Sequence, residues 1–298
     1  MNQGNPSGVT FSILIPAYNE EDAIEGVLND LTSEPFFYGQ EIIVINDGST
    51  DATAAIVGRF PGVMCVNHIL NRGYGTSIKS GVRVATGQYI CWFDADSQHQ
   101  VSDLVRLCET LAEYQLEYCI GTRNGESHQD PDRKVGKWLL KTAVNMAVGK
   151  NVPDFNSGLR GFRADILREY NHLLPNRFGA STLTTLLLIQ RNNIGATIPI
   201  TALERKGHST VNQLRDGLQT LRLILHIFIM FQPMKFFGII GASFFAVGAI
   251  YGFGKALANQ QGLPVLSMLL IMFGMQSFLF GFIGDQISAL RIDGLSKH

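Results

Sequence analysis

Two aspartates and a glutamine directly follow an apolar run in the first third of the chain. Asp94, Asp96 and Gln98 come after residues 89–93, which have the length of a strand. Alternate residues of an extended chain point to the same side, and carboxylate and amide oxygens are the ligands that Mg²⁺ prefers beside a substrate diphosphate. The spacing therefore predicts a site for Mg²⁺ or Mn²⁺. Taken alone, an Asp-x-Asp pair also fits a helix cap in a solvated turn.

Strand and helix patterns alternate through the first half of the chain. Short runs of β-branched and aromatic residues predict strands, and segments with helical periodicity separate them. This alternation predicts an α/β fold with a doubly wound parallel sheet, in which the carboxyl ends of the strands form the ligand site. The strands are expected at residues 11–15, 41–45, 63–67, 89–93 and 117–121, and the helices at 20–31, 52–59, 76–85 and 102–114.

Two strand-to-helix turns should lie at the same edge as the Asp-x-Asp pair. The segment Pro16-Ala17-Tyr18-Asn19-Glu20 offers an aromatic ring, backbone groups and an acid where a nucleobase could lie. In the turn at residues 46–51, Asp47 could accept the imino proton of a base. A plain turn is the alternative for both segments. Lys79, on the helix after the glycine loop at residues 71–75, faces either the substrate or solvent.

The composition is unusually apolar for a soluble enzyme, with 46% hydrophobic and 16% charged residues. Residues 236–257 and 263–283 are each long enough for a bilayer span of about 20 residues. Residues 258–262 join them, so the pattern predicts a transmembrane hairpin, with two core helices of a soluble fold as the alternative. Only Lys255 lies near the connecting loop, so both ends are expected in the cytosol. The cations outside the hairpin are Arg215, Arg222, Lys235, Arg291 and Lys297.

Residues 211–233 are predicted to form an amphipathic helix. Its polar residues follow 4, 3, 4 spacing along one face, beside an arc of leucines and Phe228. Such a helix would lie in the membrane interface, and a continued core helix is the alternative. The polar residues are Arg215, Gln219, Arg222 and His226. The chain thus divides into a sheet domain at 1–210, an interfacial helix at 211–233, and a hairpin with a short tail at 234–298.

Charge, cysteine spacing and the first residues exclude several classes of protein. The net charge of −1 argues against a nucleic-acid partner, which would require a basic face. The four cysteines show no paired spacing, so neither zinc nor disulfides are expected. Residues 1–10 lack the cationic and apolar parts of a signal peptide, so the sheet domain is expected in the cytosol. The sequence does not decide whether the protein forms a homo-oligomer.

The ordered set of motifs resembles the family 2 glycosyltransferases with the GT-A fold. Within them, it is most similar to the polyprenyl-phosphate hexose synthases of the dolichol-phosphate mannose synthase type. The resemblance covers roughly residues 11–210, and the two-helix tail fits the branch with a short membrane anchor. The segments that carry it are Pro16–Glu20, Asn46–Ser49, Asp94–His99, Gly121–Arg123 and Asp154–Arg163.

On the donor side, the resemblance implies that the first two motifs and Asp94 contact the nucleotide. Asp96, Asp154 and Arg123 are then the catalytic candidates. Asp154 would orient the attacking oxygen rather than remove a proton, because a phosphate acceptor is already ionised near neutral pH. The nucleotide-binding candidates are Pro16, Ala17, Tyr18, Glu20, Asp47, Lys79 and Asp94, and the metal ligands are Asp94, Asp96 and Gln98.

On the acceptor side, the resemblance places an arginine at Arg123, which would grip a lipid phosphate with its bidentate fork. A pair with a surface carboxylate is the alternative. Lys137 and Lys141, one turn apart on the following helix, could supply a second contact. The acceptor-phosphate candidates are Arg123, Lys137, Lys141, Arg160 and Arg205, the last with Lys206 as its alternative.

Two departures from the family pattern bear on the reaction. Asn46 replaces the first acid of the usual Asp-Asp-Gly-Ser, which shifts base recognition to Asp47. The Gln-x-x-Arg-Trp motif of processive members is missing, which favours a single transfer. The implied function is metal-dependent, inverting transfer of one hexose from a GDP-mannose or UDP-glucose type of donor to a polyprenyl phosphate at the cytosolic membrane face. The alternatives are another lipid or membrane glycan as acceptor, or a non-catalytic nucleotide-binding scaffold or transporter subunit.

The expected topology can be tested with a cysteine at Gln260 in the connecting loop. We expect Gln260→Cys to react with a membrane-impermeant maleimide in intact cells, because the loop should lie outside. A cysteine at Ser296 in the tail is the control and should react only in opened membranes. Labelling of Gln260→Cys only after the membrane is opened would reverse the predicted orientation.

Overall fold

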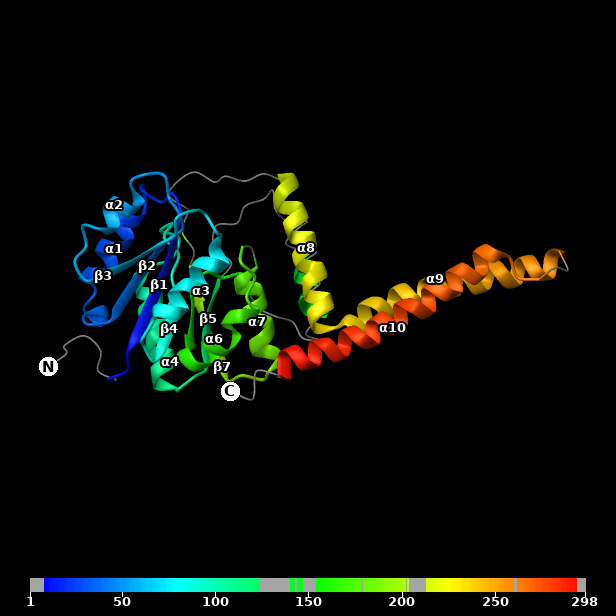
Figure 1. The fold of residues 1–298 in the computed structure, drawn as a ribbon. Coiled ribbons are helices and arrows are strands. Elements are labelled where there is room, and N and C mark those ends of the chain that lie inside the picture. The colour runs from blue at the N-terminus through cyan, green and yellow to red at the C-terminus, as the bar shows by residue number, and fades with distance from the viewer. Residues whose placement is uncertain are drawn as a thin grey trace. The chain divides into compact units, whose positions relative to one another are not determined.

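The computed structural model describes residues 8–123, 140–142, 144–146, 154–177, 179–201, 203, 213–259 and 262–293, with only the backbone at 213–220, 259 and 291–293. The described residues fall into two compact units (Figure 1). One holds a β-sheet with its helices, and the other holds two long helices near the end of the chain. Gln260, Lys137 and Arg205 lie outside the described residues.

Within the described residues, seven strands form one sheet. They are β1 (Phe11–Ala17), β2 (Glu41–Asn46), β3 (Val63–Asn67), β4 (Tyr89–Trp92), β5 (Tyr118–Arg123), β6 (Arg160–Arg163) and β7 (Gly195–Ile200). Their order is β3-β2-β1-β4-β6-β5-β7, and every pair is parallel except the two that β6 makes with β4 and β5. The predicted α/β class is confirmed, and the five predicted strands are present. The sheet is mixed rather than wholly parallel because β6, which the apolar pattern did not reveal, enters antiparallel.

Helices cover both faces of this sheet (Figure 1). Their apolar stripes pack on strands whose nearly continuous apolar runs are typical of strands buried on both faces. Side chains of α1, α2 and α4 join Ile13, Ile15 and Val44 in one apolar core. On the opposite face, α3 packs on Leu14 and Ile45, whose methyl groups would lie 2.9 Å from a Cβ at Gly81. The helices and short 3-10 helices of this unit are α1 (Ile24–Ser33), η1 (Pro35–Phe37), α2 (Thr53–Val57), α3 (Tyr74–Val84), α4 (Val101–Glu113), α6 (Ala164–Tyr170), η3 (Asn171–Leu173) and α7 (Ala180–Gln190).

The second unit contains the predicted hairpin, formed by α9 (Pro233–Asn259) and α10 (Val265–Asp293). Both helices are long and apolar enough to cross a membrane, with mean hydropathies of 1.9 and 2.0 and most of their surface exposed. Glycines let the two backbones approach: a Cβ at Gly241 would lie 2.7 Å from the carbonyl oxygen of Gly274. Close small-residue packing of this kind is typical of membrane helices.

Helix α8 (Gln213–Phe231) corresponds to the predicted amphipathic helix. Leu221, Leu225 and Ile229 recur every four residues and are exposed, with Arg222 at the edge of the same face. The side chains of Arg215 and Gln219 lie outside the described residues. An exposed apolar stripe beside a cation suits a membrane interface. The interfacial position of this helix stays a prediction.

Candidate active site

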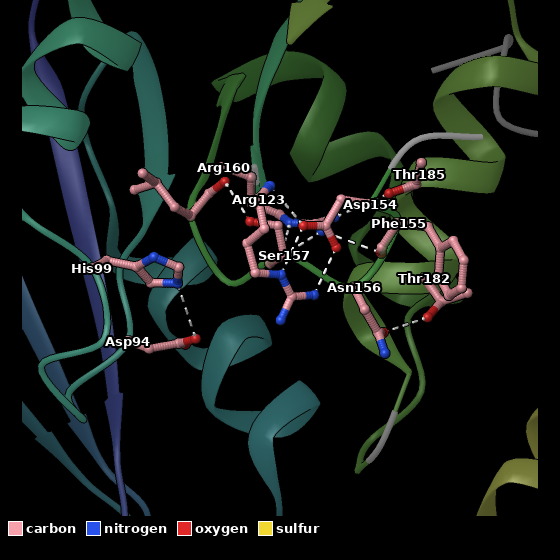
Figure 2. A network of polar contacts seen from close by, with 11 residues as sticks. Asp94, His99, Arg123, Asp154, Phe155, Asn156, Ser157, Arg160, Thr182 and Thr185 are labelled. Carbon is pink, nitrogen blue, oxygen red and sulfur yellow. Dashed lines mark hydrogen bonds and ion pairs between the residues drawn. The ribbon is translucent and has the colours of Figure 1, made fainter. Parts of the chain in front are cut away.

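Asp94 follows β4 at the edge where the parallel strands end, and several groups surround its carboxylate. The hydroxyl of Tyr74 donates a hydrogen bond to Asp94 Oδ1 at 3.2 Å. His99 Nε2 lies 3.9 Å from Asp94 Oδ2 (Figure 2). Burial, together with the negative charge of Asp94, raises the pKa of Tyr74 well above its usual range, so the hydroxyl stays a donor. Tyr74 and His99 therefore hold the Asp94 carboxylate in place, while 27% of the Asp94 side chain is exposed.

The backbone at Gly158 lies directly against the same carboxylate. A Cβ on this residue would lie 1.8 Å from Asp94 Oδ2, which no side chain can satisfy without moving the acid. Gly158 belongs to the loop at residues 154–159, between β5 and β6. That loop also carries Asp154, so one short segment touches Asp94 and supplies another acid of the predicted site.

Asp96 and Gln98 lie in a tight turn after Asp94. Ser97 has a positive φ of 60°, and the Gln98 N–H donates to Asp96 Oδ1 at 3.1 Å. The Gln98 amide nitrogen lies 3.5 Å from the Leu203 carbonyl oxygen, which turns the amide oxygen away from that contact. The turn places Asp96 and Gln98 on one short segment after Asp94, and their role as metal ligands stays a prediction.

Asp94, Asp96 and Gln98 fit a divalent ion that takes some of its ligands from the protein and the others from a substrate. No group of three or more His, Cys, Asp or Glu side chains able to hold a metal occurs among the described residues. A dedicated protein cage is therefore not shown there. Mg²⁺ usually takes only one or two carboxylates and completes its shell with water and phosphate oxygens, which matches the set Asp94, Asp96 and Gln98.

Arg123 and Asp154 form a bidentate ion pair at the end of β5. Arg123 Nε and Nη2 donate to the two Asp154 oxygens at 2.8 and 2.7 Å, and the Arg123 N–H donates to Oδ2 at 3.0 Å (Figure 2). The hydrogen bonds that Arg123 donates to Asp154, aided by the negative charges of Asp154 and Asp94, raise the pKa of Arg123 against the effect of burial. Burial raises the pKa of Asp154, but the contacts with Arg123 outweigh it, so the net pKa lies below the usual value. Both groups stay charged at neutral pH.

Arg160, at the start of β6, is fully buried under the same loop. Its guanidinium donates to the Ser157 carbonyl from Nε at 2.9 Å and to the Ser181 carbonyl at 2.8 Å, and it lies 5.5 Å from the Trp92 ring centroid. Burial lowers its pKa to about 10, which still leaves it protonated at neutral pH. The further contacts are to Thr185 and Phe155. These contacts favour a role in shaping the loop over the direct phosphate contact that the sequence suggested.

On the presumed donor side, the two motif turns are bound to each other. Asn19, with a φ of 53°, receives a hydrogen bond from the Thr50 N–H at 2.9 Å, and its own N–H donates to the Ser49 hydroxyl at 3.0 Å. The Glu20 N–H donates to the Thr53 hydroxyl at 2.9 Å. Tyr18 projects from this region with 46% of its surface exposed, as a ring that stacks on a base would.

Asp47 and Lys79 both form hydrogen bonds with other residues of the protein. The Asp47 carboxylate is buried and accepts hydrogen bonds from the backbone of Arg72 and Gly73 and from His68. Lys79 donates to Asn176 at 2.8 Å, and burial, followed by the charge of Arg83, lowers its pKa. The nucleotide contacts predicted for these two residues stay predictions.

The structure thus gathers part of the predicted site. Asp94, Asp96, Gln98, Arg123 and Asp154 lie on connected segments at the end of β4 and β5. Lys141 is exposed and belongs to the second unit, so its expected place beside Arg123 stays a prediction. Sequence reasoning assigned no role to Tyr74, Gly158 or His68, because each acts through a contact between distant segments that no local pattern reveals. It also assigned none to His99, whose contact with Asp94 is local.

The chain belongs to glycosyl transferase family 2, whose model matches residues 12–171. A second model, described as the GtrB C-terminal hairpin, matches residues 232–290, which include most of α9 and α10. The resemblance read from the motifs is therefore confirmed, and the protein is a glycosyltransferase.

Two curated relatives match along nearly the whole chain. The undecaprenyl-phosphate 4-deoxy-4-formamido-L-arabinose transferase of Pseudomonas fluorescens (strain Pf0-1) is 26% identical, and the match covers 95% of this chain and 86% of that one. Glycosyltransferase AglJ of Haloferax volcanii is 24% identical, with 98% of both chains covered. Both relatives are thus similar to this chain in the catalytic part and in the hairpin.

A solved structure supports the fold. Glucosyl-3-phosphoglycerate synthase from Mycobacterium tuberculosis, in complex with Mn²⁺, uridine-diphosphate-glucose and phosphoglyceric acid, superimposes with a TM-score of 0.59 at 18% identity. The match covers 74% of this chain and 80% of that one. This likeness confirms the predicted GT-A architecture.

The contact between Gly158 and Asp94 generates a direct test. We expect Gly158→Ala to weaken Mn²⁺ binding about 10-fold or more, because the added methyl group must displace the Asp94 carboxylate. Electron paramagnetic resonance of Mn²⁺ in the presence of UDP measures the affinity. Gly26→Ala, on an open face of α1, is the matched control and should bind as the unchanged protein does. Equal Mn²⁺ affinity in both variants would contradict a role for Asp94 in holding the ion.

Proposed function

We propose that the protein transfers one hexose from a nucleoside diphosphate sugar to a polyprenyl phosphate, with a divalent cation held by Asp94, Asp96 and Gln98. One observation carries the proposal. The loop that presses Gly158 on Asp94 also carries Asp154, which holds Arg123. Acidic groups suited to a metal and its diphosphate, and a cation suited to an incoming phosphate, are thereby fixed by one short segment.

The donor side follows from the acids at the end of β4. When bound there, Mg²⁺ or Mn²⁺ would neutralise negative charge that builds on the departing nucleoside diphosphate. Tyr74 and Gly158 hold Asp94 in position for this task. The solved synthase that shares the fold binds Mn²⁺ and uridine-diphosphate-glucose, which supports the same classes of ligand here. We propose a GDP-mannose or UDP-glucose type of donor.

On the acceptor side, Asp154 sets the orientation of Arg123. The Nε and Nη2 atoms of Arg123 face Asp154, whereas Nη1 makes no hydrogen bond to any residue that the structure describes. The side chain is 35% exposed. We therefore assign Nη1 to the acceptor phosphate, which changes the earlier expectation that the bidentate fork itself grips the phosphate. The relatives named undecaprenyl-phosphate transferases support a polyprenyl phosphate as acceptor.

The same pair bears on the chemical step. Asp154 stays ionised and ion-paired at neutral pH, since Arg123 holds its pKa below the usual value. A polyprenyl phosphate carries its own negative oxygen, so it needs orientation more than deprotonation. Direct attack of that oxygen on the anomeric carbon, opposite the departing diphosphate, inverts the anomeric configuration. Asp154 then acts as a positioning residue for Arg123.

The membrane arrangement of the proposal follows from the hairpin. We propose that α9 and α10 cross the membrane with both ends in the cytosol, as the distribution of lysine and arginine predicts. The catalytic domain at 1–210 would lie on the cytosolic face, and the helix at 211–233 would lie in the interface. Residues 234–298 would form the hairpin and its short cytosolic tail. A lipid phosphate at the membrane surface would then be within reach of a soluble donor.

A substitution at Asp96 tests the metal-dependent transfer. We expect Asp96→Asn to lower transfer of radiolabelled sugar to the lipid phase by on the order of 100-fold, because a neutral amide binds a divalent ion poorly. Chelation of divalent ions by EDTA should have the same effect on the unchanged protein. Asp30→Asn, at an exposed position of α1, is the control and should transfer normally. Chelator-insensitive transfer by Asp96→Asn would remove this acid from the mechanism.

Variants of Arg123 test the acceptor side. We expect Arg123→Ala, and also Arg123→Lys, to raise the KM for polyprenyl phosphate strongly, because lysine cannot keep the bidentate pair with Asp154. Calorimetric binding of UDP with Mn²⁺ should change little. Arg163→Lys is the control, since Arg163 pairs with Glu117 and Asp165 at the opposite edge of the sheet. If Arg123→Ala abolishes nucleotide binding and leaves the lipid KM unchanged, Arg123 belongs to the donor side.

A further inference from the structure

A row of three polar side chains, two of them buried and one half-buried, connects three segments beside the presumed nucleotide site. His68 lies between Asp47 and Ser80: its Nδ1 is 2.6 Å from Asp47 Oδ1, and its Nε2 is 2.9 Å from the Ser80 hydroxyl. The side chains of His68 and Asp47 are 6% and 4% exposed. Asp47 follows β2, His68 follows β3, and Ser80 belongs to α3.

The oxygens of the Asp47 carboxylate already accept hydrogen bonds from protein groups. The Arg72 N–H donates to Oδ1 at 2.9 Å and the Gly73 N–H donates to Oδ2 at 2.7 Å, in addition to the contact with His68. A buried carboxylate with three such donors would lose them if it turned toward a ligand, and hydrogen bonds to a buried charge are costly to break. Asp47 is therefore poorly placed to read the edge of a nucleobase.

The hydrogen bonds also indicate which ring nitrogen carries the proton. Because the Asp47 carboxylate can only accept, His68 donates to it from Nδ1–H, and its Nε2 makes the second hydrogen bond, with the Ser80 hydroxyl. Each member of the row then has a partner that suits it. The row joins the turn after β2 to the segment after β3 and to the helix that follows.

The segment that this row anchors has little apolar packing of its own. Ile69 is 97% exposed and Leu70 is 73% exposed. The segment lies against the turn after β2, because a Cβ on Gly48, which has a φ of 70°, would meet the carbonyl carbon of Leu70 at 2.6 Å. A loop without buried side chains depends on its polar anchors for a single conformation.

We infer that Asp47 and His68 are positioning residues that hold the loop Ile69–Arg72 as a wall of the nucleotide site. The inference rests on the proposed function and deepens its donor side. The loop presents two exposed aliphatic side chains next to Gly48, at the end of β2 where the resemblance puts the nucleotide. Asp47 and His68 thus set the affinity for nucleotides without selecting the base.

Calorimetry of the full-length protein in detergent, with UDP and with GDP in the presence of Mn²⁺, tests this inference. We expect His68→Ala and Asp47→Asn to weaken the binding of whichever of the two nucleotides the unchanged protein binds by about 10-fold or more, because either change breaks a hydrogen bond to a buried charge. The ratio of the two affinities should stay the same. His68→Asn should recover part of the binding, since its amide can donate to Asp47. With saturating donor, kcat of His68→Ala should stay close to that of the unchanged protein.

Tyr170→Phe is the matched control. It removes a hydrogen bond of a buried tyrosine to Asn193, at the far end of the sheet, and should leave nucleotide binding unchanged. Ser80→Ala removes only the outer partner of His68 and serves if His68→Ala does not fold; it should weaken binding less than Asp47→Asn.

Three results would contradict the inference, and they are distinguishable. Unchanged nucleotide affinity in both His68→Ala and Asp47→Asn would show that the row does not position the site. A change in the preference between UDP and GDP in Asp47→Asn, without one in His68→Ala, would make Asp47 a reader of the base. If the unchanged protein binds neither nucleotide, the proposed donor site is wrong and the inference falls with it.

Discussion

The active-site region depends on the buried guanidinium of Arg160. It lies against the Trp92 ring and donates to the carbonyl groups of the preceding loop and of α7. A fully buried charge is costly unless its donors are satisfied, and here backbone carbonyls and the aromatic face satisfy them. The loop thereby acquires one shape. That shape puts the backbone of Gly158 on Asp94 and the carboxylate of Asp154 on Arg123.

This arrangement joins the two halves of the proposed reaction. In the proposed reaction the carboxylate of Asp94, which the Gly158 backbone approaches, would serve the donor side, and Arg123, which Asp154 holds, would serve the acceptor side. Two phosphate-bearing substrates must approach one another during the transfer, so fixed charges are needed on both sides before they arrive. A loop that is held by a buried arginine can keep both charges in place without a large rearrangement. The row of Asp47, His68 and Ser80 gives the donor side a comparable anchor.

The sequence predicted most of the sheet and only part of the site. The strands β1 to β5 were found because each is a continuous apolar run followed by turn residues. Asp94 and Asp96 could be proposed as metal ligands because their spacing has a local meaning, and that role stays a prediction. By contrast, β6 is a four-residue Arg-Gly-Phe-Arg segment without such a run, and its pairing with β4 and β5 is a long-range property. The roles of Gly158, Arg160 and His68 likewise arise from contacts between distant segments. Asp47 and Arg123 were singled out as ligand contacts, yet their geometry in the fold is set first by protein partners.

Mass spectrometry of the lipid product tests the central claim most directly. The purified protein would be incubated in vesicles that contain polyprenyl phosphate, with Mn²⁺ and a panel of nucleotide sugars. The mass of the lipid product would be measured, and its anomeric configuration would be read by NMR. The account predicts one product whose mass is that of the polyprenyl phosphate plus a single hexose residue, with one phosphate and the anomeric configuration opposite to that of the donor. A product with two phosphates, a lengthening sugar chain, or a retained anomeric configuration would contradict the account.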